Sequence, residues 1–97
     1  MSSPVGTFLD DRYRLDAVVG AGGMSTVYRA FDVVLQRQVA IKLMHREIAS
    51  DSDQLERFRR EARSVAQLSH RHIVQVIDAG EDDGTPYIVF EFVEGET

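Results

Sequence analysis

Apolar and polar positions alternate along several short stretches of the chain, and this pattern predicts β-strands. Between residues 12 and 19, apolar side chains occupy every second position from Tyr13 to Val19, which is the period of a strand with one buried face. Four further stretches are rich in β-branched and aromatic residues. They predict strands at 26–32, 38–44, 73–79 and 85–92.

The spacing of apolar residues changes to steps of three and four between about residues 53 and 68, which predicts an amphipathic helix. Its inward stripe is expected to be Leu55, Phe58, Ala62, Val65 and Ala66. Four residues that can cap a helix, between 50 and 53, precede it, and the sequence does not choose among them. The order of elements predicts an α+β fold, a five-stranded antiparallel sheet with one major helix packed on it. Residues 1–11 are expected to form a flexible N-terminal tail.

The strand at 38–44 carries different chemistry on its two faces. Three large apolar residues share one face, and Ala40 and Lys42 share the other. A lone lysine in an apolar strand usually extends its ammonium to solvent. The small neighbour Ala40 and the expected pairing with the preceding hairpin favour another interpretation, in which the ammonium lies beneath that hairpin.

Glu61 interrupts the apolar stripe of the predicted helix. It could form an exposed pair with Arg57 one turn earlier, which contributes only about 0.2–0.5 kcal/mol. Alternatively it points inward, where a carboxylate is costly without a cation. Lys42 is the natural cation, and the other motifs favour this second interpretation.

Composition adds a few exclusions. The 97 residues carry a net charge of −5 and contain no cysteine, so neither a basic nucleic-acid footprint nor a thiolate site is expected. His70 and His72 have no carboxylate or cysteine to complete a metal site. No signal-peptide pattern and no apolar run of about 20 residues occurs, so no membrane segment is expected in this chain and a cytoplasmic location is the default.

The segment 19–27 reads Val-Gly-Ala-Gly-Gly-Met-Ser-Thr-Val. A cluster of glycines between apolar runs is often a simple turn. It can also bring backbone N–H groups close to a phosphate. A dinucleotide-binding fingerprint requires a helix after the glycines, whereas the residues here predict a strand, so the loop is expected to fold over its ligand as a hairpin.

Taken together, residues 11–97 resemble the N-terminal lobe of the eukaryotic-type protein kinases, most closely the bacterial serine/threonine branch. Residues 20–27 resemble the loop written G-x-G-x-x-G-x-V, with Ser25 at the third glycine, and residues 39–42 match V-A-I-K. Glu61 takes the place of the glutamate on the helix called αC. Residues 87–95 resemble the fifth strand and the hinge. Arg71 departs from a common proline in the loop before the fourth strand.

This resemblance implies an ATP site, with Lys42 on the α- and β-phosphates and Glu61 holding Lys42 as the catalytic pair. Adenine would lie between Val27 and Ala40, its edge read by main-chain groups of residues 91 and 93. The implied ATP-binding residues are Val19, Gly20, Ala21, Gly22, Gly23, Met24, Ser25, Val27, Ala40, Lys42, Phe90, Glu91 and Val93.

The resemblance further implies a serine/threonine protein kinase that transfers the ATP γ-phosphate to protein substrates. Neither a His-Arg-Asp nor an Asp-Phe-Gly motif occurs in the 97 residues. Residues 12–97 are therefore expected to be an N-lobe truncated at the hinge, inactive alone, with Mg²⁺ ligands and substrate contacts in a C-terminal lobe. An alternative is a pseudokinase or dimerisation module. Self-association through Arg12, Leu35 and Asp78 is implied by the same likeness.

Overall fold

The chain folds as one antiparallel sheet with a helix on one face, in a computed structural model that describes residues 5–62 and 73–92. The strands are β1 (Phe8–Leu9), β2 (Tyr13–Ala21), β3 (Ser25–Asp32), β4 (Arg37–Met44), β5 (Ile73–Asp82) and β6 (Thr85–Phe92). Their order in the sheet is β1-β2-β3-β4-β6-β5. A short 3₁₀ helix, η1 (Arg46–Ile48), and α1 (Ser52–Ala62) connect β4 to the second half of the sheet. The predicted α+β class is confirmed, and β2 to β6 correspond to the five expected strands.

The additional strand, β1, lies inside the segment that was expected to be a flexible N-terminal tail. Phe8 and Leu9 pair with Arg14 and Tyr13, and Leu9 is only 4% exposed. The expectation for residues 1–11 is therefore corrected at β1. A two-residue strand is too short to show a period, so the pattern of the sequence could not reveal it.

Alternation along the central strands divides the core into two clusters, one on each face of the sheet. One cluster gathers Leu15, Tyr28, Val39, Ile41 and Val89 with their neighbours. The other consists of Ala40, Met44, Phe58, Ile88 and Phe90. The division predicted for 38–44 is confirmed, because the large apolar side chains and Ala40 belong to different clusters.

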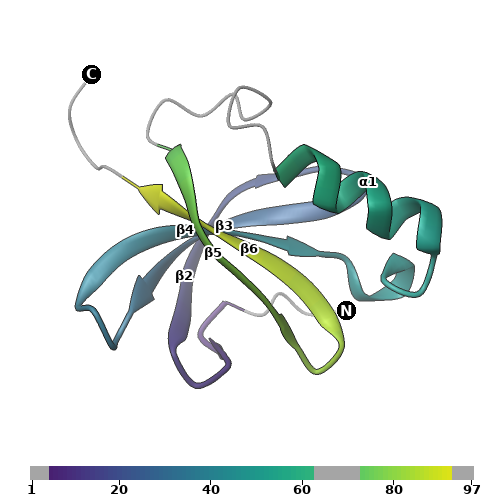
Figure 1. The fold of residues 1–97 in the computed structure, drawn as a ribbon. Coiled ribbons are helices and arrows are strands. Elements are labelled where there is room, and N and C mark those ends of the chain that lie inside the picture. Colours follow the sequence, from purple (N-terminus) through teal and green to yellow (C-terminus); the bar gives the residue numbers. More distant parts are fainter. Residues whose placement is uncertain (1–4, 63–72, 93–97) are drawn as a thin grey trace.

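Helix α1 packs on the face that carries Ala40, and Figure 1 shows it beside the twisted sheet. Phe58 is fully buried there and Leu55 packs against the same cluster. The Oδ1 atom of Asp51 accepts hydrogen bonds from the N–H groups of Asp53 at 3.0 Å and Gln54 at 3.2 Å. Asp51 is therefore the N-cap that the sequence left open. The remainder of the expected helix, to residue 68, lies outside the described residues.

Strand β2 departs from strict alternation. Its pairing with β3 shifts between Leu15 and Ala17 and again between Val18 and Gly20, as at β-bulges, where one extra residue is left unpaired. Leu15 lies opposite Ala30 and Ala17 lies opposite Arg29, and consecutive residues of β3 face opposite sides of the sheet. The prediction that Tyr13, Leu15, Ala17 and Val19 share one face is therefore wrong at Ala17, and Val19 falls at the second bulge.

Side chains join the first strands to the last strands. Tyr13 donates its hydroxyl proton to Asp78 at 3.0 Å, and Tyr87 donates to Asp10. The Tyr13 and Tyr87 rings pack edge to face with their centroids 5.9 Å apart. Burial, with the Asp78 contact, raises the pKa of Tyr13 to about 12. These contacts connect the start of β2 to the β5–β6 hairpin, although the two are not neighbours in the sheet.

Candidate functional site

The glycine-rich segment is the tight connection between β2 and β3. The N–H of Gly22 donates to the carbonyl oxygen of Ser25 at 2.9 Å, which closes a turn at the tip. None of Gly20, Gly22 and Gly23 has a positive φ, since the described glycines with positive φ are Gly6 and Gly84. The turn therefore does not use the left-handed conformation that favours glycine.

The space beside these glycines is open. A Cβ atom built on Gly20 or Gly23 meets no atom within 4 Å, and one built on Gly22 meets only the Ser25 carbonyl oxygen at 3.9 Å. The three glycines therefore leave room next to the backbone rather than relieve strain within the protein. Such room fits a ligand that approaches the main chain closely.

Lys42 lies across from this hairpin on the neighbouring strand. It pairs with Val27 of β3 on one side and with Ile88 of β6 on the other. The lysine is only 8% exposed, and its Nζ lies 5.9 Å from the centre of the Phe58 ring. Because opposed residues in a ladder project from the same face, Lys42 and Val27 share the side of the sheet that α1 covers. The ammonium is thus held between the loop and the helix.

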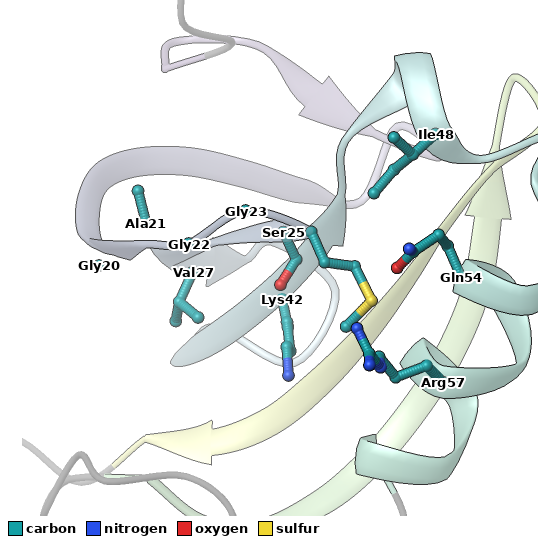
Figure 2. Close-up of a pocket in the computed structure, with 11 residues that line it drawn as sticks. Gly20, Ala21, Gly22, Gly23, Ser25, Val27, Lys42, Ile48, Gln54 and Arg57 are labelled. Atoms are coloured by element: carbon teal, nitrogen blue, oxygen red, sulfur yellow. The ribbon is translucent and has the colours of Figure 1, made fainter.

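A pocket of about 910 Å³ lies under the loop, within the size range typical of small-molecule sites. Figure 2 shows Lys42 below the hairpin, with Gln54 and Arg57 of α1 directed toward the same space. The lining residues are Gly20, Ala21, Gly22, Gly23, Met24, Ser25, Val27, Lys42, Ile48, Gln54 and Arg57. Eight of the residues that the sequence predicted for ATP binding therefore come together here.

The other predicted residues occupy different positions. Ala40 and Phe90 face each other across β4 and β6 and are almost fully buried on the Lys42 side of the sheet. Val19 falls at the second bulge of β2. The Glu91 carboxylate lies 3.8 Å from Arg37. The side chain of Glu61, in the last turn of α1, and residue Val93 lie outside what the structure describes.

Sequence reasoning missed the helical side of the pocket. Ile48, Gln54 and Arg57 line it, although the sequence suggested for Arg57 only a pair with Glu61 on the same helix. Residues 54, 57 and 58 are three and four apart and therefore share one face of α1. The predicted inward position of Phe58 was the signal in the sequence that could have revealed this lining. A buried Phe58 turns Gln54 and Arg57, which share its face of the helix, toward the loop.

The charged residues described in the lining are Lys42 and Arg57, and both are cationic. Cations beside a loop with accessible backbone suit an anion, and lysine provides a compact point charge for phosphate. No group of three potential metal ligands gathers within residues 5–62 and 73–92. The site as described therefore fits a phosphate-bearing ligand, and it contains no metal-binding cluster of its own.

None of the three residues considered for self-association lines this pocket. Arg12 makes two hydrogen bonds to Asp32, at 2.9 and 2.8 Å. Asp32 also accepts the N–H groups of Val34 and Leu35, and Leu35 is 57% exposed. Asp78 bonds to Tyr13, the neighbour of Arg12 in the chain. One network of contacts thus brings the three candidates into the same region.

Comparison with known proteins agrees with this geometry. The family model for the protein kinase domain matches residues 13–97, and the chain belongs to the protein kinase family. It is 54% identical over 88 residues to the serine/threonine-protein kinase PksC of Streptomyces coelicolor, covering 87% of this chain and 16% of that protein. It is 46% identical over 93 residues to PrkC of Bacillus subtilis, covering 96% of this chain and 14% of that protein.

Solved structures show the same fold. The kinase domain of Mycobacterium tuberculosis PknI superimposes with a TM-score of 0.65 at 30% identity, over 97% of this chain and 38% of that chain. The apo form of PpkA-294 gives a TM-score of 0.71 at 28% identity, over 99% and 40%. The chain is thus similar to the N-terminal lobe of bacterial serine/threonine kinases, and it spans about one sixth of the length of the curated relatives. Among the described residues, no helix is long and apolar enough to cross a membrane.

Proposed function

We propose that this chain is the ATP-binding lobe of a serine/threonine protein kinase that transfers the γ-phosphate of ATP to protein substrates. The observation that carries the proposal is the placement of Lys42, buried and directly across the ladder from Val27, beneath an open glycine hairpin. A buried ammonium needs a negatively charged partner, and an open loop offers backbone N–H groups to an anion. A phosphate site accounts for both features together.

In this proposal each part of the site has a separate role. The hairpin from Gly20 to Ser25 covers the phosphates, Lys42 binds them, and Glu61 orients Lys42. Adenine lies toward the hinge, between Val27 and Ala40 and in front of Phe90. Main-chain groups of Glu91 and Val93 read its edge, and Val19 lies at the base of the loop. ATP brings Mg²⁺, whose protein ligands belong to a C-terminal lobe in this family.

The same proposal covers partners and location. Protein substrates dock on the C-terminal lobe of the complete kinase, which works in the cytoplasm where ATP is available. Two copies of this lobe associate back to back through Arg12, Leu35 and Asp78. Exposed Val34 and Leu35, 63% and 57% accessible, support this surface because they offer apolar area beside an ion pair. Its test is sedimentation of a Leu35→Asp variant, which is expected to stay monomeric.

The ATP proposal is tested by comparing ATP with adenosine as ligands of the chain and of a Lys42→Met variant. Methionine preserves length and apolar contact, so the fold is expected to persist. Loss of a charge-assisted contact is worth about 1.5–3 kcal/mol, so ATP affinity should fall by roughly tenfold to a hundredfold. Adenosine affinity should change little, because the nucleoside carries no phosphate.

Arg46→Met is the matched control. Arg46 is also a cation, but its side chain is 73% exposed, it lies 3.5 Å from Asp83 and it does not line the pocket. The control should bind ATP as the unchanged chain does. An ATP affinity that is the same in Lys42→Met as in the control would reject the proposed site.

A further inference from the structure

His45 follows the last residue of β4 and contacts the tip of the glycine hairpin through both of its ring nitrogens. Its Nδ1 lies 3.2 Å from the carbonyl oxygen of Gly23, and its Nε2 lies 3.0 Å from the hydroxyl oxygen of Thr26. Its backbone N–H donates to the carbonyl oxygen of Met24 at 2.8 Å. One residue therefore makes three contacts with the segment 23–26.

The chemistry of the partners fixes the roles of the two nitrogens. A carbonyl oxygen can only accept, so the Nδ1 of His45 carries the proton that it shares with Gly23. In the neutral ring, Nε2 then accepts the hydroxyl proton of Thr26. In the imidazolium, Nε2–H donates to the same hydroxyl oxygen. The contact to Thr26 is available in both protonation states, so the arrangement is a stable support.

The contacts also determine how the tip presents its backbone. The described chain contains no cis peptide, and in a trans peptide the C=O and the following N–H point in opposite directions. Because the carbonyl of Gly23 is turned to His45, the N–H of Met24 is turned away from it. The backbone donor at the tip is thereby oriented before any ligand binds.

His45 also connects this tip to the rest of the pocket. It stands three residues after Lys42 in the chain, and its carbonyl oxygen accepts the N–H of Ile48 at 3.2 Å at the end of η1. Ile48 itself lines the pocket. The loop, the strand of Lys42 and the segment leading to α1 therefore meet at one residue, whose ring contacts the loop and whose backbone contacts η1.

We propose that His45 is a positioning residue of the phosphate-binding loop and that Thr26 is its partner. The ring holds the tip of the hairpin at a fixed place relative to Lys42, so that ATP meets a preformed lid. Preorganisation of this kind strengthens binding because less conformational freedom is lost when the ligand arrives. This inference rests on the proposed ATP-binding function, but the contact itself can be tested without nucleotide.

The first experiment measures amide hydrogen exchange in the ligand-free chain. The N–H of Gly22 closes the turn by bonding to Ser25, so its exchange reports whether the tip is held. His45→Ala and Thr26→Val should each speed this exchange by about threefold to tenfold, as the loss of one or two hydrogen bonds implies. Amides of β6 should exchange as before. Glu47→Ala, an exposed change two residues away, is the control and should alter neither region.

The second experiment measures affinity for ATP and for adenosine in the same variants. ATP affinity should fall by about threefold to tenfold in His45→Ala and in Thr26→Val, with adenosine affinity and the melting temperature close to those of the control. Thr26→Ser keeps the hydroxyl and should restore ATP binding. The double variant His45→Ala/Thr26→Val should be no weaker than His45→Ala, because both changes remove the same support.

The two experiments separate the two claims. If Gly22 exchanges at the unchanged rate in both single variants, His45 does not hold the loop and the inference is wrong. If exchange accelerates but ATP and adenosine affinities fall equally, the support is general and not directed at the phosphates, which also overturns it. Failure of the unchanged chain to bind ATP at all would reject the proposed function, whereas the exchange result would still decide whether His45 holds the tip.

Discussion

Val27 lies directly opposite Lys42 in the β3–β4 ladder, and this pairing places the glycine hairpin over the lysine. A shift of the register by one residue would turn Lys42 to the opposite face, among the residues packed around Val39 and Ile41. The hydrophobic pattern of β4 prevents such a shift, because it would expose the core side chains. The same burial that stabilises the sheet therefore keeps the ammonium next to the loop.

The open space beside Gly22 leads to a prediction that separates binding from folding. Alanine at this position meets only one atom, at 3.9 Å, and φ lies outside the left-handed region that disfavours alanine. Gly22→Ala should leave the free energy of unfolding unchanged or raise it by about 0.4–1 kcal/mol. ATP affinity should fall, since the new methyl group occupies the space next to the backbone.

Gly84→Ala is the opposite case and provides the control. Gly84 has φ +80° in the β5–β6 turn, a conformation that costs an L-residue roughly 1–2 kcal/mol. This variant should lose stability and keep its relative preference for ATP over adenosine. The two effects are measured by chemical unfolding and by calorimetric titration. A strongly destabilised Gly22→Ala chain would show that the glycine serves the fold instead.

The elements that bury one face could be predicted from the sequence, because burial on one side imposes a period of two on a strand and about 3.6 on a helix. This reasoning placed β3, β4 and β6 closely, and it assigned Ala40 and Lys42 to the correct face. The pairing of Lys42 with the hairpin followed from chain order, since consecutive strands usually neighbour each other. The hydrophobic period cannot assign a function to Lys42. The resemblance of residues 39–42 to V-A-I-K suggested that this lysine binds phosphates.

The remaining features depend on contacts between distant residues or on local irregularity. Each bulge in β2 adds one unpaired residue to the strand. The residues at a bulge have no distinctive type, so the alternation of apolar and polar positions could not locate it. The contact between His45 and Gly23 spans 22 positions and becomes visible only when the end of β4 meets the loop. The strand predicted at 73–79 continues to Asp82, so Gly80 lies within β5 and the turn is formed by Asp83 and Gly84.

The true role of Gly80 gives a second prediction. It pairs with Tyr87, and an added Cβ would lie 2.9 Å from the Tyr87 hydroxyl oxygen and 3.0 Å from Cζ. The ring cannot move freely, because its hydroxyl group bonds to Asp10. Gly80→Ala should therefore lower the free energy of unfolding by about 1–3 kcal/mol. Gly20→Ala meets no atom within 4 Å and serves as the control, and equal stability of the two variants would contradict this explanation.

The cap of α1 leads to a third prediction. Asp51 accepts two backbone N–H groups at the start of the helix, whereas Ser50 was an equally good candidate in the sequence. Asp51→Ala should cost about 0.5–2 kcal/mol of stability, measured by urea unfolding, and Asp51→Asn should recover most of it. Ser50→Ala is the matched control, with little expected effect. If the serine variant proves the costlier of the two, the cap has been assigned to the wrong residue.

The Arg12–Asp32 pair predicts how stability depends on pH. Hydrogen bonds from Arg12, supported by the N–H groups of Leu35 and Val34, hold the pKa of Asp32 below its ordinary value of 3.8 despite its burial. As the pH falls, Asp32 is therefore protonated at a higher pH in the unfolded chain than in the folded chain. The contribution of this carboxylate to stability is complete above the ordinary pKa and is lost as the pH falls through the lower value of the folded state.

Asp32→Asn should consequently be less stable than the unchanged chain at about pH 7, and the difference should shrink in acid as the natural carboxylate is protonated. Urea unfolding at a series of pH values measures it. Asp16→Asn is the control, because Asp16 also contacts an arginine, Arg14, at 2.7 Å but in a pair whose side chains are 46% and 24% exposed. Exposed pairs contribute little, so the control should follow the unchanged chain at every pH. A difference for Asp32→Asn that stays constant down to about pH 3 would show that the charge of this carboxylate does not stabilise the fold.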